Sequence, residues 1–129
     1  MNKIKILGLL AFIMLIFIIG LTMTITHNKS PNVQNFECSD YQYYIDHFPA
    51  EENIGETSDL KKLLNNVETL WIKEYGKRIK EQKPYQIYYD SDNDVLLFRG
   101  TLNTHNKGGV AHMLIKKSTG DVLAVWHEK

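Results

Sequence analysis

Thr57-Ser-Asp-Leu-Lys-Lys-Leu-Leu-Asn-Asn-Val-Glu-Thr-Leu-Trp-Ile-Lys-Glu-Tyr-Gly76 is the stretch that decides the fold of this chain. Its apolar residues recur at spacings of three and four, at Leu60, Leu63, Leu64, Val67, Leu70, Trp71 and Tyr75. Residues at these spacings share one face of an α-helix, so we expect this face to pack on a sheet. Ser58 or Thr57 can cap the start, Asp59 complements the dipole of the first turn, and Gly76 marks the end.

The pattern changes after Pro84 to short runs that are rich in β-branched and aromatic residues. These runs predict four strands, at Tyr85–Tyr89, Val95–Leu102, Gly109–Lys116 and Val122–Trp126. Hairpin turns are expected at 90–94 and 118–121, where Gly120 supplies a positive φ. The sequence therefore predicts an α+β fold with an amphipathic helix packed on an antiparallel sheet. Residues 41–49 are aromatic, and their pattern leaves a short helix or a strand open.

The N-terminal part has the length and composition of a membrane segment. Residues 6–25 are twenty consecutive residues without a charge, which is enough to cross a bilayer as a helix. Lys3 and Lys5 precede this run, which favours a cytoplasmic N-terminus. We expect residues 1–25 to be a transmembrane anchor, because the run is longer than an ordinary signal core and no small-residue cleavage site follows. A cleaved signal segment is the alternative.

Residues 26–40 are polar and rich in turn formers, so they are interpreted as a tether, and residues 41–129 as the folded domain. This organisation predicts a single-pass membrane protein whose domain lies outside the cytoplasm. If the first segment is cleaved, the domain is periplasmic or secreted instead.

Charge argues against a nucleic-acid partner. Residues 26–129 hold 13 Lys and Arg against 15 Asp and Glu. The one basic cluster comprises Lys73, Lys77, Arg78, Lys80 and Lys83, and Glu74 and Glu81 interrupt it. A domain that holds DNA or RNA usually carries a basic stripe. We therefore interpret the cluster as the solvated face of a helix and its exit turn.

Three aspartates at alternate positions, Asp90, Asp92 and Asp94, resemble the start of a calcium loop. Such a loop needs Gly at its sixth position and Glu at its twelfth, where this chain has Val95 and Thr101. The segment is therefore interpreted as an acidic turn, and no metal site is expected there.

The remaining candidates for chemistry are isolated. His105, His112 and His127 do not have the spacing of a zinc site, and they are interpreted as a loop histidine and two strand histidines facing solvent or partly buried. The single cysteine, Cys38, is expected to be a semi-buried or exposed bystander near the tether. No catalytic residue, cofactor or metal ligand is predicted.

Several short motifs follow one another in a fixed order over the second half of the chain. They are Trp71-Ile-Lys-Glu-Tyr-Gly-Lys-Arg-Ile, Lys83-Pro-Tyr, Gly100-Thr-Leu, Gly108-Gly-Val and Lys117-Ser-Thr-Gly-Asp-Val-Leu-Ala-Val-Trp-His127. This series, the signature series below, resembles the NTF2-fold immunity proteins. The resemblance implies an NTF2-like domain with a curved sheet, and a protein that neutralises a cognate bacterial toxin by binding and performs no reaction. Gly108 and Gly109 are interpreted as the kink that starts the third strand.

Two other functions stay open from the sequence. One is an envelope enzyme or small-ligand binder with an NTF2-like pocket, for which Asp94 and His112 are the residues to inspect. A core filled by Trp71, Phe98 and Trp126 would argue against it. The other is an envelope accessory or scaffold protein. For toxin binding, the tyrosines Tyr41, Tyr43 and Tyr44 are candidate anchors. The sequence does not indicate the oligomeric state.

Overall fold

The longest helix among the described residues, α3 (Leu60–Tyr75), forms where the apolar stripe predicted it. Its N-cap is Asp59, whose carboxylate accepts hydrogen bonds from the backbone N–H groups of Lys61 and Lys62. The sequence placed the cap at Ser58 or Thr57 instead, because hydroxyl and carboxylate caps are equally good in principle. Gly76 ends the helix with φ 85°, in the left-handed region that glycine adopts without strain.

This computed structural model describes residues 31–55, 58–103 and 108–129. The predicted membrane or signal segment, Thr57 and His105 lie outside the described residues. Within the described part of the chain, no helix is both long enough and apolar enough to cross a membrane.

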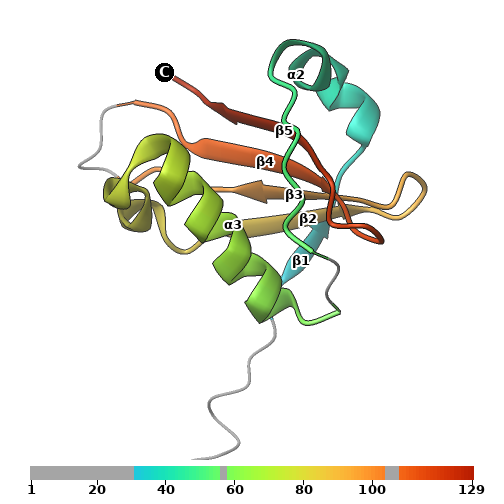
Figure 1. The fold of residues 1–129 in the computed structure, drawn as a ribbon, viewed down its shortest axis with the longest axis horizontal. Helices are drawn as coiled ribbons and strands as arrows, with labels where there is room; N and C mark the ends of the chain where they lie inside the picture. The colour runs from blue at the N-terminus through green and yellow to red at the C-terminus, as the bar shows by residue number, and fades with distance from the viewer. Residues whose placement is uncertain (1–30, 56–57, 104–107) are drawn as a thin grey trace, which may run out of the picture. The chain divides into compact units, whose positions relative to one another are not determined.

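Five strands form one sheet in chain order (Figure 1). They are β1 (Val33–Asn35), β2 (Gln86–Asp90), β3 (Val95–Arg99), β4 (Ala111–Lys116) and β5 (Val122–His127). Strands β2 to β5 are antiparallel neighbours, which confirms the predicted four-strand meander. Gly120 has the positive φ expected of the last turn, 76°.

The sheet is mixed, and the sequence prediction of a wholly antiparallel sheet is wrong at its first strand. β1 pairs with β2 in parallel, with Val33 opposite Ile87. The segment that supplies β1 was interpreted as part of the tether, whereas the compact unit begins at Pro31. β1 is only Val-Gln-Asn with every residue exposed, so it has no alternating apolar pattern to indicate a strand.

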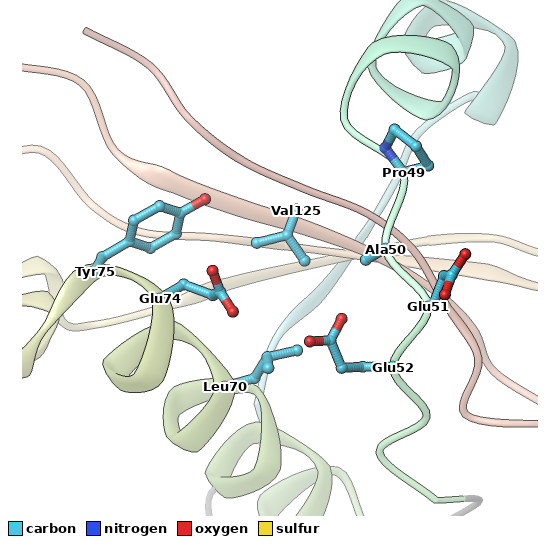
Figure 2. A pocket seen from close by; sticks show the side chains of 8 residues that line it. All are labelled: Pro49, Ala50, Glu51, Glu52, Leu70, Glu74, Tyr75 and Val125. Atoms are coloured by element: carbon cyan, nitrogen blue, oxygen red, sulfur yellow. The ribbon is translucent and has the colours of Figure 1, made fainter.

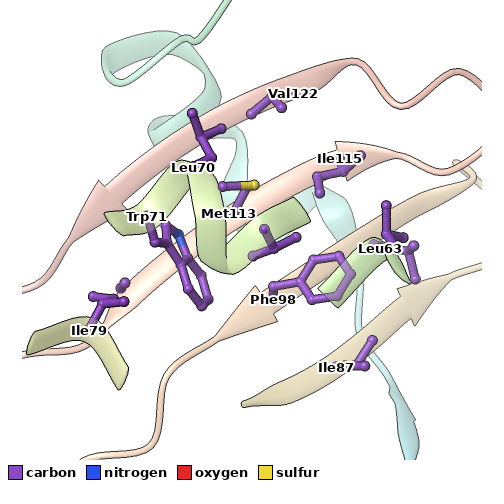
Figure 3. Packing of buried hydrophobic residues seen from close by; sticks show 12 residues of the cluster. Leu63, Leu70, Trp71, Ile79, Ile87, Phe98, Met113, Ile115 and Val122 are labelled. Atoms are coloured by element: carbon purple, nitrogen blue, oxygen red, sulfur yellow. The ribbon is translucent and has the colours of Figure 1, made fainter. Parts of the chain in front are cut away.

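The two faces of the sheet are covered by different elements. α3 packs on one face, where Leu63, Trp71, Phe98 and Met113 are almost completely buried (Figure 3). On the other face lie η1 (Cys38–Tyr41) and α2 (Gln42–His47), and the buried residues there are Cys38, Val95, Leu97, Leu114, Ala124 and Trp126. Residues 41–47 are therefore helical, the first of the two alternatives. Cys38 is buried by this packing, contrary to the expected semi-buried or exposed thiol.

Candidate functional site

The aromatic residues of the signature series hold the helix against the sheet. Trp71 is fully buried, and its Nε1 donates to the backbone carbonyl of His112 at 3.3 Å. Its ring meets the ring of Tyr85 edge to face, with centroids 5.2 Å apart. Tyr85 in turn donates to the Glu68 carboxylate on α3 at 2.6 Å. These residues therefore act in packing, and no reactive group is exposed among them.

The glycines of the same series lie where two backbone segments approach closely. A Cβ at Gly100 would overlap Gln82, whose Oε1 accepts the backbone N–H of Ala111 at 2.9 Å. A Cβ at Gly109 would overlap the backbone of Glu128 near the chain end. Gly109 thus allows a close approach within the protein, in addition to starting the third predicted strand. Trp71, Gly100 and Gly109 of the signature series therefore stabilise the fold.

The acidic turn uses its carboxylates to bind protein groups. Asp90 accepts hydrogen bonds from the backbone N–H groups of Cys38, Asp92 and Asn93. Hydrogen bonds from the Asn93 side chain and from Cys38 lower the pKa of Asp90. Asp94 accepts from the Tyr89 hydroxyl at 3.1 Å and from the backbone N–H of Ser118 at 3.0 Å. Over the described residues, no three His, Cys, Asp or Glu side chains gather as metal ligands.

His112 is almost completely buried, with 2% of its surface exposed, so the expectation of a solvent-facing or partly buried histidine is corrected. Its ring stacks on Trp126 with centroids 4.8 Å apart. Desolvation lowers the pKa of His112 to about 4, although Glu128, 3.6 Å away, opposes the shift. The side chain is thus neutral at neutral pH. His127 lies at the exposed end of β5, where its Nε2 is 3.1 Å from Gln82 Nε2.

The structure contains a surface groove that the sequence did not predict. It lies between α3, β5 and the segment that follows α2, and its volume is about 420 Å³ (Figure 2). We call it the α3–β5 groove. Its lining residues are Pro49, Ala50, Glu51, Glu52, Leu70, Glu74, Tyr75 and Val125. Neither Asp94 nor His112, the two residues marked for inspection, is among them.

Carboxylates dominate the polar part of this groove. Glu52 pairs with Lys73 at 3.5 Å. The side chains of Glu51 and Glu74 form no hydrogen bond or ion pair with another residue in the described ranges. Tyr75 is 37% exposed, and partial burial and the nearby Glu74 raise the pKa of its hydroxyl. The arrangement suits the binding of a cationic group.

The candidate tyrosine anchors differ in their exposure. Tyr43 is 59% exposed on α2 and stacks on His47. Tyr41 and Tyr44 are half-buried, because both pack on Trp126, with the Tyr44 ring 4.2 Å from it. Of the three, Tyr43 therefore offers the largest free surface to a partner.

A family model described as "NTF2 fold immunity protein" matches residues 65–129. The match runs from the middle of α3 to Lys129 and includes the whole signature series, with β2 to β5. No curated protein matches the chain, and no solved structure matches it either.

Proposed function

The chain belongs to the NTF2 fold immunity protein family, and on this premise we propose that it binds and neutralises a cognate bacterial toxin without catalysing a reaction. The observation that carries the proposal is the family match over residues 65–129. Immunity of this kind requires a surface complementary to the toxin, and it requires no active-site residue in the immunity protein itself.

The packing beneath α3 supports a binding function over an enzymatic one. A pocket enzyme on this fold would need an open cavity between the helix and the sheet. Beneath the middle of α3 that space is occupied by side chains, since Trp71, Phe98 and Met113 have no exposed surface. The α3–β5 groove stays open at the edge strand β5. On the other face Trp126 is 3% exposed and stacks between Tyr44 and His112. The central part of each face of the sheet is therefore filled by the protein's own core.

For localisation we propose that the N-terminal segment holds the domain at the membrane, outside the cytoplasm. The proposal rests on the uncharged run of residues 6–25 and on Lys3 and Lys5 before it. Alkaline phosphatase fused after Lys129 should be active in cells, because the enzyme matures only outside the cytoplasm. An inactive but stable fusion would contradict this topology. The mass of the mature chain distinguishes an anchor from a cleaved segment.

The test of the function is binding combined with growth rescue. The full-length chain is co-expressed with the product of any large toxin-like gene that is encoded beside it, and it is then purified in mild detergent through a C-terminal tag. We expect the toxin to co-purify and the cells to survive toxin induction. A chain that purifies alone and rescues no growth would contradict the proposal, and the small-ligand-binding alternative would then be tested by ligand screening.

A further inference from the structure

We propose that the α3–β5 groove is the part of this protein that contacts the toxin, and that it receives an arginine side chain from the toxin surface. The inference rests on the proposed function and adds the location and chemistry of the contact. Three features of the groove support it: the charge of its rim, the character of its floor and the aromatic ring at one end.

The rim has negative charge that the protein leaves uncompensated. Glu74, from the last turn of α3, and Glu52, from the segment after α2, point toward each other across the groove (Figure 2). The described residues provide one cation at this rim, Lys73, which pairs with Glu52 at 3.5 Å and is itself 68% exposed. Glu74 and Glu51 have no such partner. A cation placed between Glu52 and Glu74 would be attracted to both carboxylates.

The floor of the groove is apolar. Ala50, Leu70 and Val125 form it, and Val125 and Leu70 face the opening from β5 and α3 respectively (Figure 2). A long basic side chain has an aliphatic stem that packs on such a surface while its charged end stays at the rim. The groove volume of about 420 Å³ is sufficient for one such side chain.

Arginine fits this site better than lysine. Its planar guanidinium forms paired hydrogen bonds with carboxylates, and it also stacks on aromatic rings. Tyr75 lies at one end of the groove, and 37% of its surface is free for such stacking. Arginine is also frequent among the residues that dominate protein–protein binding energy.

The exposed aromatic residues in and directly after α2 are weaker candidates for the toxin contact. Tyr43 already stacks on His47 at 4.1 Å, and Phe48 is 43% exposed beside it. Neither residue lines the α3–β5 groove. These residues provide no charge that would select one partner chemistry.

Charge reversal tests the contact directly. The full-length protein is compared with Glu74→Arg, Glu52→Arg and the control Asp46→Arg, which makes the same charge change at an exposed position of α2. A cation at position 74 complements the C-terminal end of the α3 dipole, so Glu74→Arg should fold normally, and circular dichroism verifies this. We expect Glu74→Arg to raise the Kd for the toxin that the unmodified protein binds by about 30-fold or more, and Asp46→Arg by less than about threefold.

A charge swap identifies the partner residue. Toxin arginines are changed to Glu one at a time, and one of these variants should restore binding to the Glu74→Arg protein. If the unmodified chain neither binds the toxin nor rescues growth, the proposed function fails. If it does both, and the folded Glu74→Arg and Glu52→Arg variants bind equally well, the proposed function stands and the groove is not the contact. If Asp46→Arg weakened toxin binding as much as Glu74→Arg, the groove would not be the specific contact, and the proposal would be overturned.

Discussion

The carboxylate of Asp90 accepts a hydrogen bond from the backbone N–H of Cys38 at 2.8 Å, between residues that are 52 positions apart. The same carboxylate accepts from the backbone N–H groups of Asp92 and Asn93 within the β2–β3 turn. The Asp90 side chain therefore connects the start of η1 to the β2–β3 hairpin, whose strand β2 pairs with β1. Without this bond, the N–H of the buried Cys38 would lose its acceptor.

We predict that Asp90→Ala destabilises the domain and separates η1 from the sheet. The substitution removes the acceptor for the backbone N–H of Cys38 and the acceptor shared by the backbone N–H groups of Asp92 and Asn93. An unsatisfied buried donor is costly. Urea denaturation should show a lower midpoint for Asp90→Ala. Asp92→Ala is the matched control, since Asp92 is exposed in the same turn and its side chain forms no hydrogen bond or ion pair with another described residue. Equal midpoints for the two variants would contradict the assigned role of Asp90.

The elements with strong periodicity were predictable from the sequence. The apolar stripe through Leu63, Val67 and Trp71 gave the correct helix, and the β-branched runs gave four strands. The strand ends were less accurate: the run from Val95 to Leu102 is a strand only as far as Arg99. After Arg99 the backbone turns toward Gln82, and the backbone N–H of Thr101 donates to the Gln82 carbonyl at 2.7 Å. Contacts of this kind depend on distant residues and leave no local pattern.

The candidate site was not predictable for the same reason. Glu52 and Glu74 are 22 positions apart, and each resembles an ordinary exposed glutamate in the sequence. They meet because the segment after α2 runs beside β5, where Pro49 bridges to Ala124. The sequence also did not predict the burial of His112. This burial results from the stacking on Trp126 and from the packing of η1 and α2 on the same face of the sheet.

The N-cap of α3 provides a second prediction. Asp59→Ala should reduce the free energy of unfolding by about 1 kcal/mol, because the Lys61 and Lys62 backbone N–H groups lose a capping acceptor. Chemical denaturation followed by circular dichroism measures the change. Ser58→Ala is the control and should leave stability nearly unchanged. A larger loss for Ser58→Ala would show that the serine is the cap, as the sequence alone suggested.

Trp71 provides the largest expected effect on stability. Trp71→Ala should reduce the free energy of unfolding by about 3–5 kcal/mol, because it leaves a cavity beneath α3. It also removes the donor to the His112 carbonyl. The control is Tyr43→Ala, which truncates a 59% exposed aromatic residue and should change stability by less than about 1 kcal/mol. Comparable losses in the two variants, measured in urea, would contradict the core assignment.

The burial of His112 predicts how stability depends on pH. Desolvation lowers the folded-state pKa to about 4 from 6.5, so between these values the unfolded chain binds a proton that the folded chain does not. The contribution of neutral His112 is therefore fully present above pH 6.5, and it is lost progressively as the pH falls toward 4. The loss should reach about 3 kcal/mol.

The variant His112→Gln isolates this effect, because glutamine stays neutral throughout the range. Three nearby groups affect the pKa of His112 through their charges, and the variant leaves them unchanged. They are Glu128, Arg99 and His127. We expect the free energy of unfolding of the wild type, measured in urea from pH 7 to pH 4.5, to fall more steeply than that of His112→Gln. His47→Gln, at an exposed position, should retain the wild-type slope. Parallel curves for the wild type and His112→Gln would mean that the folded state accepts the proton at position 112, and the stacking on Trp126 would then have to accommodate a charged ring.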